Sequence, residues 1–194
     1  MSNKVKIVSY WVVVGVLAVV LISAILVIII AQWRFIKAEF EIGNPKEHPN
    51  YAGVLKIEAV DIEVPLVQAY RGEEQSVVDK GNCAAEMVWR LGAVPSGDKV
   101  TKEDYAHLIG DHRSQEFKTL VDCKEDDKAI IKRPDGTVEE YKVVKVFSGE
   151  NTRSDLVDGE GKSVLNQNKN GIILYTCLDS TEIPVFFVFL QPLG

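Results

Sequence analysis

The sequence predicts a mostly β domain, built as a barrel or sandwich of short strands, that follows one transmembrane helix. Three observations predict this class. Residues 7–31 are apolar and carry no charge, apolar and polar residues alternate over 54–60 and 62–67, and Pro134-Asp135-Gly136 separates two apolar runs. Alternation with a period of two is typical of half-buried strands, and a turn of this composition between apolar runs indicates a hairpin.

The apolar segment predicts a membrane anchor. At a rise of about 1.5 Å per residue, the helix spans a hydrocarbon core of about 30 Å. Trp11 and Trp33 lie near its two ends, where amphipathic rings favour the membrane interface. A cleaved signal peptide would have a shorter apolar region and a small-x-small cleavage site, which Ala31-Gln32-Trp33 is not. We therefore expect a short tail at 1–6, a signal anchor at 7–32, a linker at 33–52 and one domain at 53–194.

Charge restricts the partners of the domain. The chain has a net charge of −6, and all four charged residues among the first 37 are basic, so the remainder is more acidic than the whole. General nucleic-acid binding requires a basic surface, and we expect no nucleic-acid partner. Lys4 and Lys6 precede the anchor and Arg34 and Lys37 follow it. The basic residues are thus nearly balanced across the anchor, so the positive-inside rule does not by itself orient the domain.

The same patterns predict the elements of the domain in order. We expect strands at 54–60, 62–67, 105–110, 129–132, 138–147, 172–176 and 185–190. The segments between them are expected to include a short helix or loop at 73–80, a turn at 95–99 and a long polar loop at 148–170. Phe117 and Leu120 are three residues apart and are expected to share one face of a helical turn. Many short strands with only local helices favour a barrel or sandwich.

The cysteines and acidic residues predict no cofactor. Cys83, Cys123 and Cys177 are an odd number, so at least one is unpaired. Cys83 could form a disulfide with Cys123, or all three could be reduced, two of them buried as small apolar groups. No Cys-x-x-Cys occurs and the three histidines lack the spacing of zinc ligands. Calcium could bind acidic loops at 103–104 and 125–127, but they lack EF-hand spacing, so solvated charge is the simpler interpretation.

The candidate site combines a thiol with an imidazole. Cys177 ends an expected strand, and His112 follows another. A thiolate is a strong nucleophile, and an imidazole can take or return the proton that acyl transfer moves. Sixty-five residues separate the two, so only folding can bring them together. The plain alternatives are a buried thiol and a loop histidine bonded to the backbone, while His107, at the start of its strand, is expected to be structural and partly exposed.

Short motifs carry a resemblance to a known family. Leu174-Tyr175-Thr176-Cys177 is similar to a strand motif Thr/Ile/Leu-Leu-x-Thr-Cys, and Gly110-Asp111-His112-Arg113 with Phe117 and Leu120 is similar to a segment Gly-His-(Asn/Arg)…Phe-x-x-Leu. Leu55-Lys56-Ile57 with Val64-Pro65-Leu66 resembles a pair of opening strands, and Asp135-Gly136 with Tyr141-Lys142-Val143 resembles a hairpin. In this order, over about residues 53–190, they resemble the sortases, membrane-anchored cysteine transpeptidases of Gram-positive bacteria.

The resemblance implies a fold and an activity. The fold would be a closed or semi-closed β-barrel of about seven to eight strands. Cys177 would be the nucleophile and His112 the general acid or base. The enzyme would cleave a C-terminal sorting motif of the Leu-Pro-x-Thr-Gly kind in surface proteins through a thioacyl intermediate. It would then transfer them to an amine of a cell-wall precursor or a pilin, with the domain outside the cell membrane.

The sequence departs from the family pattern at three places. Asp111 stands between the glycine and the histidine, and Glu58 stands where proline is usual. Residues 178–187 contain no basic side chain, although sortases carry there the arginine that holds substrate and steadies the oxyanion. Thr176, Arg153 and Arg113 are the candidates for this support. Arg113 neighbours His112, but adjacent residues of an extended chain tend to point apart. If nothing replaces the arginine, the alternative is a catalytically weak or inactive membrane-tethered scaffold.

Overall fold

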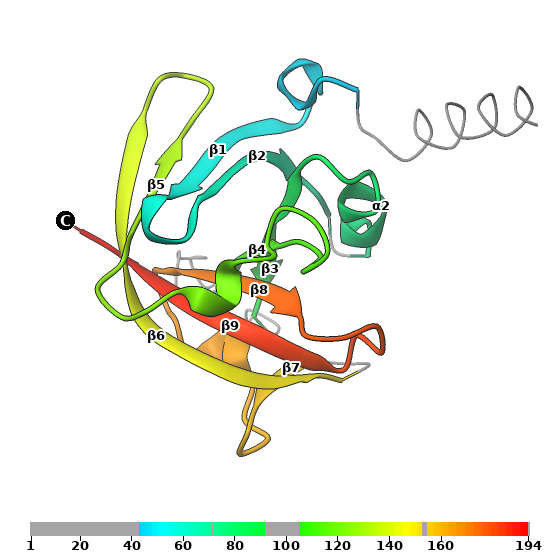
Figure 1. Ribbon diagram of the computed structural model, residues 1–194, viewed down its shortest axis with the longest axis vertical. Helices are drawn as coiled ribbons and strands as arrows, with labels where there is room; N and C mark the ends of the chain where they lie inside the picture. Colours follow the sequence, from blue (N-terminus) through cyan, green and yellow to red (C-terminus); the bar gives the residue numbers. More distant parts are fainter. Residues whose placement is uncertain (1–42, 71, 92–104, 153–154, 194) are drawn as a thin grey trace, which may run out of the picture. The chain divides into compact units, whose positions relative to one another are not determined.

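The computed structural model describes residues 43–70, 72–91, 105–152 and 155–193, which form one mixed β-sheet. Its strands are β1 Tyr51–Ile57, β2 Ile62–Gln68, β3 Ala84–Arg90, β4 Tyr105–Gly110, β5 Lys128–Lys132, β6 Val138–Asn151, β7 Leu156–Asp158, β8 Ile172–Cys177 and β9 Pro184–Pro192. One helix, α2 Glu74–Val78, lies beside them, with short 3₁₀ turns at Pro45–Glu47, Glu58–Val60, Leu120–Asp122 and Val164–Asn166 (Figure 1). The predicted anchor at 7–32 lies outside these residues. Within them, no helix is long and apolar enough to cross a membrane.

The strands close into a barrel. Their order in the sheet is β5-β1-β2-β3-β4-β8-β9-β6-β7, and β5 also pairs with β6, so eight strands form a ring to which β7 adds an edge (Figure 1). This confirms the prediction of a mostly β barrel. Most pairs are antiparallel, but β2 pairs with β3 and β4 with β8 in parallel, which the sequence patterns did not reveal.

Three elements differ from the sequence-based expectations. β3 was not predicted at all. Residues 58–60 form a 3₁₀ turn after β1 rather than the end of the strand, because the chain reverses through Asp61, which has a left-handed φ of 54°. The segment 148–170, expected to be a loop, contains the last residues of β6, the whole of β7 and a 3₁₀ turn. Leu156 of β7 and Val164 of the turn are buried in the core. The segment resembled a loop because its only aliphatic side chains are Leu156, Val157, Val164 and Leu165.

Two apolar clusters cover the two faces of the barrel wall. Because side chains alternate along a strand, one set fills the barrel and the other faces outward. The interior cluster includes Leu55, Leu66, Ile109, Phe117, Leu120, Leu174 and Val188. The outer cluster includes Val77, Val78, Met87, Leu108, Ile173, Val185 and Phe187. Phe117 and Leu120, predicted to share a face, are both fully buried in the interior cluster, so they anchor the segment after β4 to the barrel.

A buried charged network explains why β3 was missed. Glu86, in the middle of β3, is 5% exposed, and it accepts hydrogen bonds from Arg133 at 2.8 and 2.9 Å. Its carboxylate also lies 2.7 Å from Nε2 of His107, which agrees with the structural role expected for that histidine. Burial opposes ionisation, but His107 and Arg133 together hold the pKa of Glu86 below its ordinary value. A carboxylate in a strand is thus stabilised by partners that are distant in sequence.

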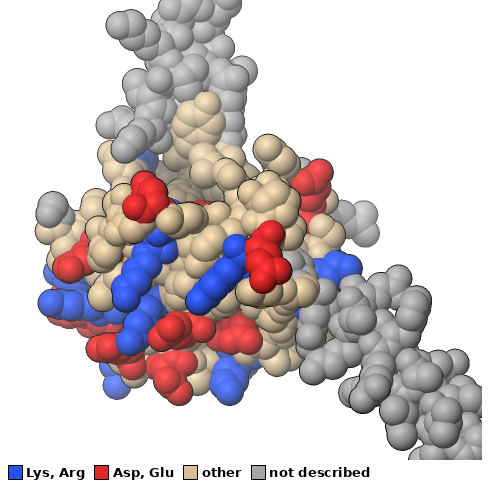
Figure 2. Space-filling view, turned by 90° about the horizontal axis from the view of Figure 1, so that it is seen from above, with Lys and Arg blue, Asp and Glu red and all other residues tan. Residues whose placement is uncertain are grey.

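The surface carries charges of both signs. On the face shown in Figure 2, basic and acidic side chains are interspersed rather than separated by sign. Exposed ion pairs occur in the described part of the chain, such as Lys56 with Glu58 at 2.9 Å and Lys142 with Asp126 at 3.1 Å. Exposed pairs of this kind contribute little to stability, so the barrel depends on its two apolar clusters and its backbone pairing.

Candidate active site

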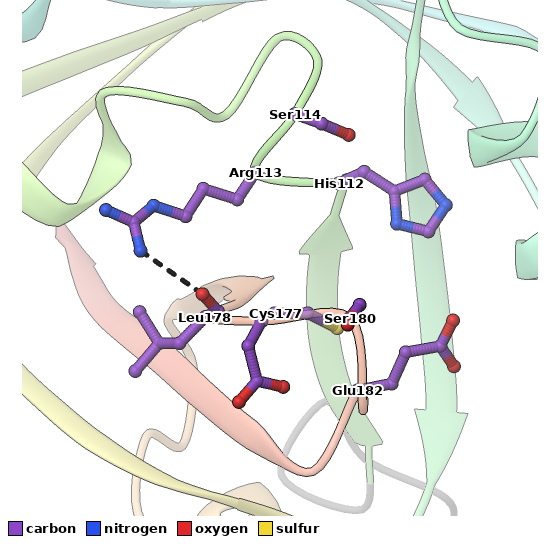
Figure 3. Close-up of a pocket in the computed structure, with 8 residues that line it drawn as sticks. His112, Arg113, Ser114, Cys177, Leu178, Ser180 and Glu182 are labelled. Atoms are coloured by element: carbon purple, nitrogen blue, oxygen red, sulfur yellow. Dashed lines mark hydrogen bonds between the residues drawn. The ribbon is translucent and has the colours of Figure 1, made fainter.

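The candidate site lies where two parallel strands end. β4 and β8 pair in parallel from His107 with Ile172 to Gly110 with Tyr175, so both chains leave the sheet at the same end of the barrel. Cys177 is the last residue of β8, and His112 follows β4 by two residues. Both line one cavity of about 400 Å³ (Figure 3). The other lining residues are Arg113, Ser114, Leu178, Asp179, Ser180 and Glu182. The parallel pairing therefore brings the two candidate residues together.

A close approach between Gly110 and Tyr175 fixes the two strand ends against each other. These residues are register partners in β4 and β8. A Cβ atom on Gly110 would overlap the Tyr175 ring. The ring packs against the outer apolar cluster. Glycine is therefore needed here for space, two residues before His112 and next to the strand that carries Cys177.

Asp111, the residue that interrupts the sortase-like motif, anchors the segment after β4. Its side chain is 5% exposed, and its two carboxylate oxygens accept hydrogen bonds from the backbone N–H groups of His112 at 2.8 Å and Glu116 at 3.0 Å. Burial raises the pKa of Asp111 to about 7, against these hydrogen bonds, which lower it. The extra residue is thus part of the local structure that holds His112, and it does not displace the histidine from the cavity.

The His112 imidazole is held from the side of α2. Its Nε2 lies 2.9 Å from Oδ1 of Asp79 and 3.4 Å from Nε2 of Gln75. The other ring nitrogen, Nδ1, faces the side on which Cys177 lies (Figure 3). Sequence reasoning missed Asp79, because a lone aspartate in a segment expected to be a short helix or loop carries no motif.

Cys177 differs from the two other cysteines in its surroundings. None of the three forms a disulfide, which confirms the interpretation as reduced thiols. Cys83 and Cys123 are buried, and burial raises the pKa of each to about 12. Cys177 is only half-buried and faces the cavity. Burial, and then the charges of Glu182 and Asp179, raise the pKa of Cys177, so the resting group is a thiol that needs a proton acceptor.

The three candidates for the missing arginine have different placements. Arg113 lines the cavity together with His112, and a turn begins at this residue. As expected, the two side chains point apart, yet both line the cavity (Figure 3). An N–H of the Arg113 guanidinium donates a hydrogen bond to the carbonyl oxygen of Leu178 at 3.2 Å, next to Cys177 (Figure 3). Arg153 lies outside the described residues.

Thr176 does not form a wall of the cavity. It is fully buried, and the alternation along β8 turns it to the same side as Leu174, inside the barrel. Its hydroxyl has no hydrogen-bond partner among the described residues. We expected Thr176 to support substrate because it is adjacent to Cys177. Adjacent residues of a strand face opposite sides, so Thr176 points away from the cavity that Cys177 lines.

The described part of the chain contains no candidate metal centre. No group of three or more His, Cys, Asp or Glu side chains in these residues could hold a metal ion. The acidic loop at 103–104 lies outside them. The chemistry available in the cavity is that of a thiol, an imidazole, a guanidinium and carboxylates.

Comparison with solved structures identifies the fold. No family model matches the sequence, and no curated protein matches it. The chain is similar to sortase C of Streptococcus pneumoniae, at 19% identity and a TM-score of 0.51 over 76% of this chain and 71% of that chain. It is also similar to a lid mutant of sortase A from Corynebacterium diphtheriae, at 19% identity and a TM-score of 0.50 over 78% and 75%. The third is sortase C1 from Streptococcus suis, at 16% identity and a TM-score of 0.50 over 75% and 74%. The domain therefore has the sortase fold expected from the motifs.

The carboxylate of Glu182 provides a test of the electrostatics of the cavity. Because its charge raises the pKa of Cys177, Glu182→Gln is expected to lower that pKa and to increase the thiolate fraction below it. The pH profile of Cys177 alkylation, measured by mass spectrometry of the modified peptide, should move to lower pH. Glu125→Gln, which removes an exposed charge outside the cavity, should leave the profile unchanged. An unchanged or upward-shifted profile for Glu182→Gln would contradict this account.

Proposed function

We propose that the protein is a sortase-type cysteine transpeptidase. It would cleave a sorting motif of the Leu-Pro-x-Thr-Gly kind near the C-terminus of a surface protein and transfer that protein to an amine of the cell wall or of a pilin. The observation that carries the proposal is the convergence of Cys177 and His112 on one open cavity at the shared end of β4 and β8, in a sortase fold. The similar sortase C of Streptococcus pneumoniae is an enzyme with pilin substrate specificity, which agrees with a pilin as one of the partners.

The proposed reaction uses the two side chains in sequence. Neutral His112 accepts the proton of the Cys177 thiol, and the sulfur attacks the carbonyl carbon of the scissile peptide bond to give a tetrahedral oxyanion. The C–N bond then breaks, the imidazolium donates its proton to the departing amine, and a thioester remains on Cys177. A second amine attacks the thioester, His112 takes its proton, and the sulfur leaves as the new amide forms. The raised pKa of Cys177 makes the proton acceptor necessary.

Arg113 is the proposed replacement for the missing arginine. Its guanidinium donates to the carbonyl of the residue that follows the nucleophile, and its side chain lines the same cavity. An arginine carries several N–H donors in a rigid planar group, so it can hold the Leu178 carbonyl while another N–H is directed at substrate. In the proposed enzyme it holds the carbonyl of the sorting motif or the oxyanion that develops from it.

The predicted anchor completes the proposed setting. A helix at 7–32 would hold the domain at the outer face of the cell membrane, where sorting signals and cell-wall or pilin amines are present. This localisation follows from the proposed reaction and from the apolar segment of the sequence.

Trapping of the thioester tests the proposal. The full chain is incubated with peptides that contain Leu-Pro-x-Thr-Gly variants, and adducts are located by intact mass and peptide mapping. We expect one acyl adduct on Cys177, released as a hydroxamate by hydroxylamine, and no adduct on Cys177→Ala or His112→Ala. Cys123→Ala serves as the matched control and should keep the adduct. Absence of any adduct on the unmodified protein would favour the membrane-tethered scaffold.

A further inference from the structure

Asp79 contacts the candidate general acid or base from an element that the sequence motifs do not include. It is the residue that follows α2, and its backbone N–H donates to the carbonyl oxygen of Gln75. Val77 and Val78 of the helix are 9% and 7% exposed and belong to the outer apolar cluster. The end of the helix is therefore held by apolar contacts, and the position of the Asp79 carboxylate does not depend on His112 alone.

Two side-chain nitrogen atoms lie within hydrogen-bond distance of one oxygen of the Asp79 carboxylate. Oδ1 of Asp79 lies 2.9 Å from Nε2 of His112, and it accepts a hydrogen bond from Nε2 of Gln75 at 2.8 Å. An ionised carboxylate only accepts hydrogen bonds, so the imidazole nitrogen beside it must carry a proton. A neutral imidazole has one N–H, and the lone pair is then on Nδ1. Nδ1 is the nitrogen on the side of Cys177 (Figure 3).

We propose that Asp79 is a positioning residue, which keeps the proton on Nε2 of His112 so that Nδ1 exchanges the proton with Cys177. This inference rests on the proposed function. Asp79 does not line the cavity, so it acts through the imidazole. Once Nδ1 has taken the proton from the thiol, the imidazolium carries a positive charge beside the carboxylate, and the attraction between them stabilises it. Without Asp79, the neutral ring could also carry its proton on Nδ1, and that form cannot accept one from Cys177.

The exposure of the pair sets the size of the expected effect. The Asp79 side chain is 45% exposed and that of His112 is 23% exposed. Solvent screens such a pair, so its loss should reduce the rate by less than the full contribution of general acid–base catalysis, which is about 10²–10⁴. If Asp79 only tied α2 to the segment after β4, its substitution would change the stability of the domain. It would not change which nitrogen of the His112 ring carries the proton.

The tautomer of His112 tests the inference without reference to activity. In the full chain labelled with ¹⁵N-histidine, at an alkaline pH at which the rings are neutral, the spectrum of His112 should show the proton on Nε2. His112→Gln assigns the signal among the three histidines. Asp79→Asn should shift the signal toward a mixture of tautomers. Glu73→Gln, which removes an exposed charge at the other end of α2, should leave it unchanged. A proton on Nδ1 in the unmodified protein would overturn the proposal.

The rate of thioester formation supplies the second readout. Asp79→Asn should lower kcat by about 10- to 10²-fold with little change in KM, and Asp79→Glu should recover part of the loss. Glu73→Gln should match the unmodified chain, and thermal unfolding confirms that each variant is folded. If the unmodified chain forms no thioester, the proposed function fails, while the tautomer still tests the role of Asp79. If the thioester forms and Asp79→Asn changes neither its rate nor the tautomer, the inference alone fails.

Discussion

Arg113→Ala is expected to lower the rate of thioester formation by about 10²-fold, the lower end of the effect of removing an oxyanion donor. The physical reason is that residues 178–187 carry no basic side chain, whereas the Arg113 guanidinium lines the cavity and reaches the Leu178 carbonyl. The side chain is exposed, so the loss should be smaller than for a buried donor. The measurement is kcat for thioester formation from a sorting-motif peptide.

Two further variants separate this role from a general effect of charge. Lys118→Ala removes an exposed cation from the same segment outside the cavity and should leave kcat unchanged. Arg113→Lys keeps the charge but loses the planar group of donors, so it should have an intermediate rate. A full rate for Arg113→Ala would mean that the guanidinium only ties the segment after β4 to the chain beyond β8, and that the cavity steadies an oxyanion by other groups.

Gly110→Ala is expected to destabilise the domain by about 1–3 kcal/mol, the usual effect of overpacking, and to lower thioester formation at the same time. The added methyl group would overlap the Tyr175 ring, which packs against the outer cluster. Displacement of the ring would disturb β8 at a position two residues before Cys177. It would also disturb β4 at a position two residues before His112. Denaturant unfolding and kcat, measured on the same samples, check both parts.

A double-mutant cycle identifies the overlap as the cause. Tyr175→Leu removes the ring atoms that the methyl group would meet, so Gly110→Ala should have a much smaller effect on stability in that background. Gly159→Ala is the matched control, because nothing lies within 4 Å of a Cβ atom there. Equal losses from Gly110→Ala in the two backgrounds would show that the contact with Tyr175 does not determine the effect.

The sequence was sufficient to predict the strands in which apolar and polar residues alternate. β4 has the predicted bounds, Tyr105–Gly110, and β8 differs from its prediction by one residue. β3 was missed because Glu86 in its centre is stabilised by His107 of β4 and by Arg133, which follows β5, and these distant partners leave no local signal. Pairing direction is also a long-range property. The parallel contact between β4 and β8 depends on the connections through the whole barrel and cannot be read from either strand alone.

The site was predictable only where a motif marks it. Cys177 and His112 were identified from their flanking residues, and the fold places both at one cavity. The local rule that adjacent side chains point apart holds for His112 and Arg113, but it could not show that both line one cavity. The interpretation of Thr176 as substrate support was wrong, since the alternation of β8 buries it. Asp79 contributes through a contact between α2 and the segment after β4, which no local pattern encodes.

The most direct test of the central claim is the alkylation rate of each cysteine in the full chain, before and after His112→Ala. The claim is that folding gives the thiol of β8 an imidazole partner in an accessible cavity. It predicts that a mild electrophile labels Cys177 much faster than Cys83 or Cys123, and that His112→Ala removes this preference. Equal labelling of the three cysteines, or a preference that persists without the imidazole, would contradict it.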